Sequence, residues 1–431
     1  MKVLVVVRLF SGLTRSLRDQ VWQPEGVPAV VKLLEALTRD NIASCITVFT
    51  VKDRQTAKTF PKAAKFELSP IGLVRILPYR RLPGNFLRLE LLVTECEQLI
   101  RCLALYIAHQ PSAAYFSFAN FMIGGIFARL SLTRTVLRVM GIFPHHRILL
   151  NGKRTIWTSL QRWFLRSPYS HVICTEEGSG AESVLPALLG PTTPFSLLLN
   201  GVDPKPVSPM EIDTLKQRCA LSGRPVVLFL GRLEPYKGCH EFTDAVIKLL
   251  NQRPASIYAV IVGSGSATEE IAQKIRGEGK EADIRLIGSV PHEEVPIWYA
   301  SADIYVSLNK HGNLSNANLE ALAAGRCMIL PSAQIEEHID LATEELLSPT
   351  IVPRVDSKDL ANSLVFQLLV LIEDPALIDS LAMETKRRSS ELLSSWSDRI
   401  ALEIELIRGT VAPFTSAPNG VVNPTASQES N

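Results

Sequence analysis

Short apolar segments that alternate with amphipathic segments constrain the fold of this chain more than any other feature. From residue 225 the order reads PVVLFLGRL, EFTDAVIKLLNQ, SIYAVIVGSG, ATEEIAQKIRGEG, IRLIGSV, VPIWYASA, DIYVSL, NANLEALAAG and RCMILPS. The short apolar runs have the length of buried strands, and the segments between them have the spacing of helices. This alternation predicts a parallel sheet covered on both faces, which is a doubly wound α/β domain.

The N-terminal half shows the same alternation and predicts a second domain of the same class. The chain opens on a buried strand, MKVLVVVRLF, which is followed by a long loop. A helix then begins near Pro28, because proline is favoured at the first position of a helix, and leads to the strand SCITVFTV. Further strands are expected at 114–118, 135–140 and 171–174.

A proline-rich stretch divides the two halves. DPKPVSP, at 203–209, has no apolar period and is typical of an interdomain linker. We therefore predict an N-terminal domain over 1–203 and a C-terminal domain over 204–390, with helices continuing to about 409. Residues 410–431 are rich in Pro, Ser, Asn and Thr, so we expect a disordered tail there.

Cysteine content and charge indicate the compartment and the partners. Seven cysteines are scattered without a Cys-x-x-Cys pair or a Cys/His cluster, which predicts a reducing compartment and no structural metal. The first strand is too short for a secretory leader and the apolar window 113–128 is too short for a membrane span, so we expect a cytoplasmic protein. Residues 1–200 hold 24 Lys and Arg against 12 Asp and Glu, whereas residues 201–431 hold 21 against 31. This asymmetry predicts an anionic partner for the first half.

Two cations follow the strand VVLFLG of the second half. Arg232 comes directly after Gly231, and Lys237 precedes Gly238 at the start of a helix. Ligands bind at the carboxyl ends of parallel strands, where Arg grips phosphate oxygens bidentately and Lys acts as a point charge. Two positive charges can stabilise a diphosphate leaving group without a metal, and the chain has no Asp-x-Asp sequence. The alternative is that both residues are surface charges of a loop.

The segment HGNLSNANLEALAAG carries the second element of the predicted site. Ser315 or Asn316 can cap a helix that runs toward Gly325, which would direct free N–H groups and the positive end of the helix dipole at a ligand. Glu320, one turn into this helix, is suited to accept hydrogen bonds from a ribose diol. A glutamate in a helix is also an ordinary exposed residue, and that interpretation stays open.

Two more glycines, Gly263 and Gly265, lie between a strand and a helix in VIVGSGSATEE. The third glycine of a dinucleotide fingerprint is missing, and so is an acidic residue after the next strand. We interpret this segment as a tight turn near the nucleotide. The chain also lacks a Walker-type GxxxxGK[ST] motif, which leaves kinase or ATPase chemistry without support.

Five collinear segments resemble the donor-binding domain of the large retaining GT-B glycosyltransferase family, which includes sucrose and glycogen synthases and bacterial envelope mannosyltransferases. They are LLNGVD at 198–203, FLGRLEPYKG at 229–238, IVGSG at 261–265, IGSVPHEEVPIWYASADIYVS at 287–307 and NLEALAAG at 318–325. The stretch SWSDRIALEIELI at 395–407 is similar to the family's final helix, which packs back on the N-terminal domain. The resemblance implies an α/β fold of the GT-B type, in which two doubly wound Rossmann-like domains face a cleft and 391–409 is the returning helix.

The resemblance also implies a role for each matching residue. Arg232 and Lys237 would bind the donor diphosphate and act in catalysis, and Glu320 would hold the ribose. The backbone from Gly288 to Val290 would frame the base, and the loop with Gly12 would close over the diphosphate. The residues expected at the donor are Gly12, Gly231, Arg232, Lys237, Gly263, Gly288, Val290, His311, Ser315, Asn316, Ala317 and Glu320.

Two positions depart from the family around the sugar. Gly312 stands where the family usually has a glutamate that touches the donor sugar, and Met140 stands where it commonly has a histidine near the reacting carbon. His311 is the candidate for a sugar contact. We expect a metal-independent, hexosyltransferase-like enzyme without a cofactor that uses a nucleotide sugar as substrate, with retention, in envelope or exopolysaccharide assembly. A non-catalytic scaffold that binds a nucleotide sugar, or a nucleotide-sugar epimerase of the same fold, remains an alternative.

Basic residues of the first half bear on the acceptor. GKRTIWTSLQRWFLR, at 152–166, places apolar side chains at helical spacing beside arginines, and PYRRLPGNFLR adds a second arginine cluster. Such a helix either lies on an anionic membrane or packs its apolar stripe on the sheet. Together with the charge balance, this predicts a lipid-linked or anionic acceptor at the cytoplasmic face of a membrane. Nucleic acid is not expected, because aromatic residues are not interleaved with the basic ones in any binding motif.

Overall fold

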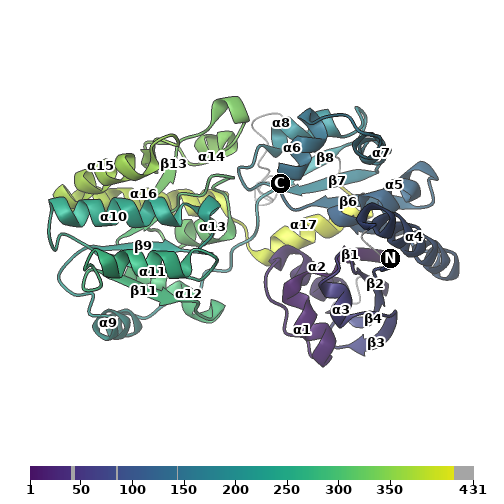
Figure 1. Ribbon diagram of the computed structural model, residues 1–431, viewed down its shortest axis with the longest axis horizontal. Coiled ribbons are helices and arrows are strands. Elements are labelled where there is room, and N and C mark those ends of the chain that lie inside the picture. Colours follow the sequence, from purple (N-terminus) through teal and green to yellow (C-terminus); the bar gives the residue numbers. More distant parts are fainter. Residues whose placement is uncertain (40–43, 84–85, 143, 412–431) are drawn as a thin grey trace, which may run out of the picture. The chain divides into compact units, whose positions relative to one another are not determined.

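The computed structural model describes residues 1–39, 44–83, 86–142 and 144–411. They form two compact units, each built around its own sheet (Figure 1). The first unit holds Met1–Thr175, Ala181–Leu198 and the described residues from Trp396 onward, and the second holds Glu176–Gly180 and Leu199–Ser395. Nearly all of the predicted disordered tail, 410–431, lies outside the described residues.

The described part of the first unit has an eight-stranded sheet in the order β3-β4-β2-β1-β5-β6-β7-β8. All neighbouring strands are parallel except β3 and β4, which form an antiparallel pair at one edge. The strands are β1 (Lys2–Arg8), β2 (Ser44–Thr50), β3 (Ala64–Leu68), β4 (Gly72–Leu77), β5 (Ala113–Ser117), β6 (Arg134–Val139), β7 (His171–Thr175) and β8 (Phe195–Leu198).

Helices cover both faces of this sheet, because its central strands are apolar on both sides. In β1, Val3 and Val5 pack on one face beneath α1, α2 and α17, whereas Leu4 and Val6 pack on the other beneath α4, α5, α7 and α8. The helices are α1 (Ser11–Asp19), α2 (Pro28–Arg39), α3 (Thr56–Thr59), α4 (Leu87–His109), η1 (Phe118–Asn120), α5 (Phe121–Arg129), α6 (Pro144–Asn151), α7 (Ile156–Leu165), α8 (Ala181–Leu188) and α17 (Trp396–Arg408).

The strands and the Pro28 helix of the first half are confirmed, but the long loop predicted after β1 is wrong. Helix α1 begins at Ser11, directly beyond β1, and the chain lacks regular structure only from about residue 20 to 27. Leu13 and Leu17, one turn apart, are buried in the core and hold this short helix on the sheet. Gly12 therefore lies in a helix, where a Cβ would approach the Glu25 carbonyl oxygen to 1.7 Å.

The apolar stripe of α7 packs on the first unit. Trp157, Leu160 and Phe164 lie against the core under α5, as the packing alternative for 152–166 predicts. Ile156 and Trp163 point away from that core and are 93% and 48% exposed. No helix in the described residues is both long enough and apolar enough to cross a bilayer.

The C-terminal helix α17 packs on the first unit beside α2 (Figure 1). It is held there by a fully buried ionic group as well as by apolar contacts. The Glu403 carboxylate accepts hydrogen bonds from Tyr115 Oη at 2.8 Å and Arg399 Nη1 at 2.7 Å, and Arg138 Nε lies 3.0 Å from it. Burial disfavours the charged form, but Arg138 and Arg399 hold the pKa of Glu403 below its usual range.

The described part of the second unit has a six-stranded parallel sheet in the order β11-β10-β9-β12-β13-β14. Helices α10, α11, α15 and α16 contribute to the core on one face, and α9, α12 and α13 to the core on the other. The elements are α9 (Pro209–Arg218), β9 (Val226–Leu230), η2 (Pro235–Lys237), α10 (Cys239–Gln252), β10 (Tyr258–Val262), α11 (Thr268–Gly277), β11 (Ile284–Gly288), η3 (His292–Glu294), α12 (Val295–Ser301), β12 (Ile304–Val306), α13 (Asn316–Ala323), β13 (Cys327–Pro331), η4 (Ile335–Glu337), α14 (Leu341–Leu346), β14 (Arg354–Val355), α15 (Leu360–Glu373) and α16 (Pro375–Leu392).

The strand order of the second sheet has a switch point between β9 and β12. From β9 the chain adds β10 and β11 on one side and then returns to add β12, β13 and β14 on the other. The chain connections on the two sides of this switch point run in opposite directions, so the carboxyl edge between β9 and β12 is the expected place for a ligand. The loop after β9 carries Arg232 and Lys237, and the loop after β12 leads into α13.

Candidate functional site

Arg232 and Lys237 lie around a single aromatic ring in the turn after β9. Arg232 Nη2 donates a hydrogen bond to Tyr236 Oη at 2.6 Å, and Lys237 Nζ lies 5.4 Å from the Tyr236 ring centroid. The Tyr236 ring also stacks on His311, with centroids 5.6 Å apart and planes at 22°. The loops that leave β9 and β12 thus meet at Tyr236 and His311.

Arg232 lies close enough to Lys237 to disfavour the charged form of the lysine. Burial lowers the pKa of the Lys237 ammonium, the Arg232 charge lowers it further, and Glu177 opposes this effect. An anion that binds to both side chains would relieve this repulsion. Arg232 is exposed, as the surface-charge interpretation also predicts, and the closeness of the two cations is the feature that would suit a diphosphate.

Glycines let the loops at this edge approach closely. A Cβ on Gly263 would lie 1.8 Å from the Gly231 carbonyl oxygen, and one on Gly238 would lie 2.4 Å from Leu308 Cβ. The Gly263 N–H donates to the Gly288 carbonyl at 2.8 Å, which joins the loops after β10 and β11. Glycine at these turns thus lets the backbones of neighbouring loops pack directly against one another.

Helix α13 begins where the sequence predicts, but without a side-chain cap. Ser315 is the N-cap residue by its backbone angles, yet its hydroxyl makes no capping hydrogen bond. The Asn316 side chain instead accepts from Asn200 Nδ2 at 2.6 Å. The first-turn N–H groups, including that of Ala317, are therefore not bonded by the cap side chain and can serve a ligand.

Glu320 is a half-buried residue of α13, not the freely exposed one of the alternative interpretation. Its side chain is 26% exposed, with Oε1 3.9 Å from His292 Nε2 and Oε2 3.5 Å from Tyr299 Oη. Burial raises the pKa of Glu320, while His292 and Tyr299 oppose the rise. Val290, in the loop between β11 and α12, is half-buried against the same core. A ribose bound between Glu320 and this loop would donate hydrogen bonds to the carboxylate in place of the water that burial has removed.

A buried polar network holds the loop after β12, and no sequence motif predicts it. The Asn313 backbone and side-chain N–H groups both donate to the Asp340 carboxylate at 2.7 Å. Thr343 Oγ1 donates to Asp340 at 2.6 Å, and Ser307 Oγ and Asn313 Oδ1 lie 3.0 Å apart. Burial raises the pKa of Asp340 to about 6, against the effect of these hydrogen bonds. The partners are far apart in the sequence and follow no spacing rule.

Gly312 occupies a position in the described structure that has no room for a side chain. Its φ is 124°, and a Cβ would lie 2.3 Å from the Glu177 carbonyl oxygen. The Glu177 carbonyl also accepts from the Leu314 N–H at 3.1 Å, so the segment Glu176–Gly180 takes the space beside this loop. Any side chain at position 312 would therefore require this loop or the segment Glu176–Gly180 to move.

The remaining predicted positions lie elsewhere. Gly12 and Met140 belong to the first unit, where Met140 is partly buried against the core. No group of three or more His, Cys, Asp or Glu side chains in the described residues has the arrangement of a metal site. Tyr236 was missed by the sequence analysis, although its position between Arg232 and Lys237 was a signal for it.

Comparison with known proteins identifies the second unit. Residues 224–369 match the family model described as "Glycosyl transferases group 1". The chain is 27% identical over 173 residues to 2-deoxystreptamine glucosyltransferase of Streptomyces kanamyceticus, a match that covers 39% of this chain and 44% of that protein. It is 30% identical over 139 residues to lipopolysaccharide core biosynthesis mannosyltransferase LpsB of Rhizobium meliloti, which covers 31% and 39%. The chain thus spans less than half the length of each of these relatives.

Solved structures extend the likeness to nearly the whole chain. The structure of HepE from Anabaena in complex with UDP-glucose superposes with a TM-score of 0.65 and 17% sequence identity, covering 94% of this chain and 99% of that one. At this identity the likeness concerns the fold. Residues 224–369 thus form a glycosyl transferases group 1 domain, and the chain has the GT-B fold, with two Rossmann-like domains.

Proposed function

We propose that this protein is a glycosyltransferase that moves a sugar from a nucleotide sugar to an acceptor. The observation that carries the proposal is the pair of cations, Arg232 and Lys237, gathered around Tyr236 at the switch point of a group 1 domain. They stabilise the departing diphosphate, whose negative charge grows as the glycosidic bond breaks. The α13 N-terminus supports the phosphates or the sugar, and Glu320 holds the ribose.

The same pair of cations is the basis for proposing that no metal takes part. A guanidinium and an ammonium supply about two positive charges, which is what a leaving diphosphate needs. The UDP-glucose complex of HepE, with the same fold, supports a nucleotide sugar as the donor. Retention of configuration follows the resemblance of the motifs to retaining enzymes.

We further propose that the acceptor belongs to envelope or exopolysaccharide assembly. The mannosyltransferase LpsB, a relative over part of the chain, is named for lipopolysaccharide core biosynthesis. A lipid-linked or anionic acceptor at the cytoplasmic face of a membrane fits the excess of Lys and Arg in residues 1–200.

One observation favours a second candidate function, a nucleotide-sugar-binding scaffold without turnover. Position 312 cannot hold a carboxylate beside the donor sugar, because the Glu177 carbonyl fills the place of its Cβ. The nucleotide part of the site is unaffected by this difference. The scaffold would therefore bind the same donor as the enzyme and differ only in the chemical step.

A donor panel separates the two functions. UDP-, GDP- and ADP-sugars are tested for a rise in melting temperature, which a ligand of the folded state produces, and for release of the nucleoside diphosphate. Loss of charge-assisted hydrogen bonds, worth about 1.5–3 kcal/mol, should weaken donor binding about 10- to 100-fold in Arg232→Ala and Glu320→Ala. Arg253→Ala is the matched control, because Arg253 forms an exposed ion pair with Glu373 on the same unit. Binding without turnover on any acceptor favours the scaffold, and no binding of any donor contradicts both functions.

A further inference from the structure

The long helix α4 of the first unit turns polar side chains inward. Glu90 is 1% exposed and accepts hydrogen bonds from Arg54 Nε at 2.8 Å, Tyr79 Oη at 2.9 Å and the Leu82 N–H at 3.0 Å. These partners come from the segments that follow β2 and β4. The inward face at the start of α4 is thus built from hydrogen bonds and not from apolar packing.

The next two turns continue this pattern. Gln98 is fully buried, and its Nε2 donates to the carbonyls of Val51 and Pro78 at 3.0 Å each. Thr94 Oγ1 accepts from the Arg80 N–H at 2.9 Å. These side chains satisfy backbone groups just beyond the strand ends, which would otherwise be buried without partners. The orientation of α4 about its axis is therefore determined by its polar face.

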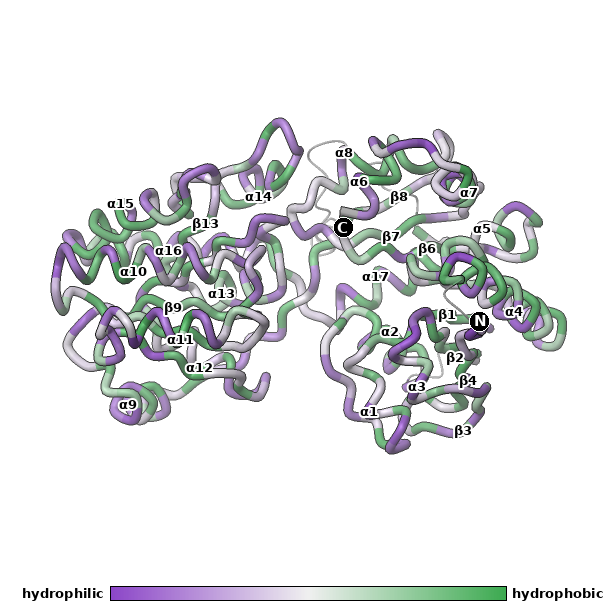
Figure 2. Tube along the Cα trace, in the orientation of Figure 1, coloured by the Kyte–Doolittle hydropathy of each residue, from purple (hydrophilic) through white to green (hydrophobic). Residues whose placement is uncertain are grey.

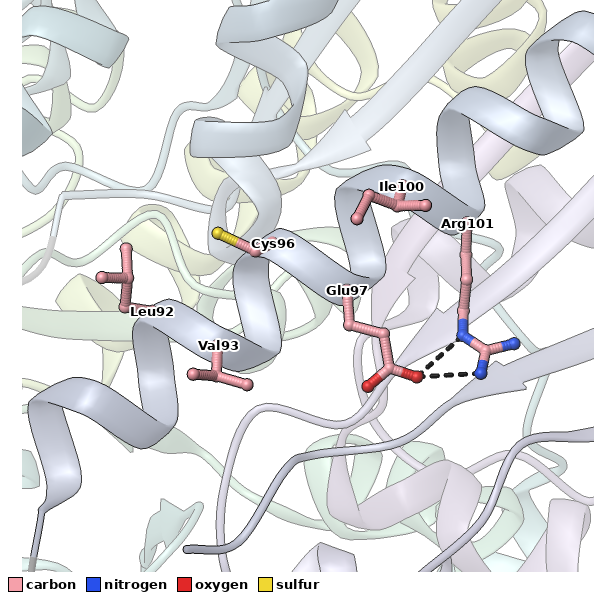
Figure 3. A pocket seen from close by; sticks show the side chains of 6 residues that line it. All are labelled: Leu92, Val93, Cys96, Glu97, Ile100 and Arg101. Atoms are coloured by element: carbon pink, nitrogen blue, oxygen red, sulfur yellow. Dashed lines mark hydrogen bonds and ion pairs between the residues drawn. The ribbon is translucent and has the colours of Figure 1, made fainter.

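As a consequence, one row of apolar side chains of α4 faces away from the core, although Leu99, Cys102 and Leu103 still pack on it. Figure 2 shows that the helix is hydrophobic along much of its length. Leu92, Val93, Cys96 and Ile100, with Glu97 and Arg101, line an open depression of about 530 Å³ (Figure 3). The exposed fractions along this segment are Phe86 60%, Leu87 51%, Leu89 49%, Leu92 41%, Val93 37%, Ile100 66% and Ile107 69%. Leu89, Leu92, Val93, Ile100 and Ile107 recur at helical spacing on one side of α4, and we call these five side chains the α4 face. Leu87 lies on the opposite side of the helix, and Phe86 precedes it.

Charge distinguishes the candidates for what covers the α4 face. Arg81 and Arg88 are exposed at its N-terminal end, and Glu97 is paired with both Arg80 and Arg101. The four arginine charges here are therefore balanced by a single carboxylate, that of Glu97. A second copy of this chain, packed face to face, would bring these like charges together, whereas an anionic lipid surface attracts them.

The neighbouring helices extend the same chemistry. Helix α5 lies between α4 and α7 and contacts both. On α7, Trp163 is 48% exposed, and the Arg129 guanidinium lies 3.6 Å above its ring. Tryptophan beside arginine is typical of side chains at the boundary between lipid headgroups and acyl chains.

We propose that the α4 face docks this protein on an anionic lipid surface. Leu89, Val93 and Ile100 enter the boundary of the acyl chains, while Arg81 and Arg88 contact lipid phosphates. The proposal rests on the proposed function only in that a lipid-linked acceptor is found at such a surface. Lipid binding itself needs neither donor nor acceptor, so it can hold or fail independently of transfer activity.

The test is cosedimentation of the full chain with vesicles, without any nucleotide sugar. Equal parts of phosphatidylcholine and phosphatidylglycerol should bind the protein at low salt, and phosphatidylcholine alone should bind it much more weakly. Leu89→Glu/Val93→Glu should lower the partition coefficient at least about tenfold, since two apolar side chains no longer enter the bilayer. The matched control is Phe366→Glu/Val370→Glu, an exposed apolar pair with the same spacing on α15 of the second unit, which should bind as the wild type does.

The following vesicle-binding and oligomeric-state results would contradict the proposal. Equal binding of both vesicle types, or of the wild type and Leu89→Glu/Val93→Glu, overturns it. So does failure of the wild type to bind phosphatidylglycerol vesicles at low salt. A dimer by light scattering that Leu89→Glu/Val93→Glu converts to a monomer assigns the α4 face to a second copy instead. Unchanged melting temperatures of both double variants show that a loss of binding does not come from unfolding.

Discussion

At the scale of single residues, Tyr236 links the functional groups of the candidate site. Its hydroxyl accepts from Arg232, and its ring stacks on His311 and lies near Lys237. The hydrogen bond limits the rotamers of a long, exposed arginine side chain before any ligand arrives. Tyr236 is therefore a positioning residue for Arg232, since less conformational entropy is lost when the diphosphate binds.

We expect Tyr236→Phe to weaken binding of a nucleoside diphosphate about three- to tenfold, as loss of one hydrogen bond of about 1 kcal/mol implies. The ring stack on His311 is retained, so the unit should keep its melting temperature without ligand. Isothermal titration calorimetry measures the change. Tyr258→Phe is the control, because Arg224 also stacks on Tyr258, at 3.6 Å, but at the amino end of the sheet. Equal losses in both variants would contradict a specific role for Tyr236.

Arg232, Lys237 and Glu320 could be predicted from the sequence because strand-end positions and local spacing mark them. Asp340 could not, since it reaches the site only through Asn313 and the turn that precedes α14. The exposure of Glu320 was also open in the sequence, because burial depends on Tyr299 and His292 from another helix and its preceding turn. Local spacing names candidates, and tertiary neighbours set their charge and burial.

At the scale of elements, the loop between β12 and α13 depends on the Asp340 carboxyl. Burial raises the pKa of this carboxyl to about 6 in the folded protein, above its ordinary value of 3.8. A raised carboxyl pKa contributes stability that is fully present below the unfolded pKa and is lost as pH rises through the folded one. Asp340 should therefore lower the stability of the second unit between about pH 4 and pH 7, by about 3 kcal/mol in all.

We expect Asp340→Asn to remove this part of the pH dependence. The difference in stability between the variant and the wild type should shift in favour of the variant as pH rises from 4 to 7, whatever its value at pH 4. Thermal denaturation across this pH range measures the difference. Asp379→Asn, which removes a carboxylate at an exposed position of α16 outside this network, is the control. Parallel curves for Asp340→Asn and the wild type would show that Asp340 does not titrate in this range.

Helix α17 supplies a second test at this scale. Glu403→Ala would leave Arg138 and Arg399 buried without their shared carboxylate, which costs about 3–5 kcal/mol. Glu405→Ala, on the exposed side of the same helix, should change stability by less than about 0.5 kcal/mol. Denaturant unfolding monitored on the first unit compares the two. A loss of under about 1 kcal/mol in Glu403→Ala would mean that apolar contacts alone hold the helix.

At the scale of the whole molecule, the cations of the site and the absence of Asp-x-Asp lead to a prediction about metals. We expect the rise in melting temperature produced by a nucleoside diphosphate to be the same in EDTA as in excess Mg²⁺. At a ligand concentration about 100 times Kd, the stabilisation is about 2.7 kcal/mol. Arg232→Ala should reduce the rise under both conditions. A rise that needs Mg²⁺ would mean that a metal shares the diphosphate with Arg232 and Lys237.

The sequence by itself determined that the chain folds into two α/β units, and it predicts a binding site at the ends of β9 and β12. The two units follow from local periodicity, because a buried strand and an amphipathic helix are recognised from neighbouring residues. The tertiary structure alone decided that α1 replaces a loop, that Glu176–Gly180 belongs to the second unit and leaves no room at Gly312, and that α4 turns one row of apolar side chains outward. Each of these depends on contacts between residues distant in the sequence, whose geometry exists only after the chain has folded.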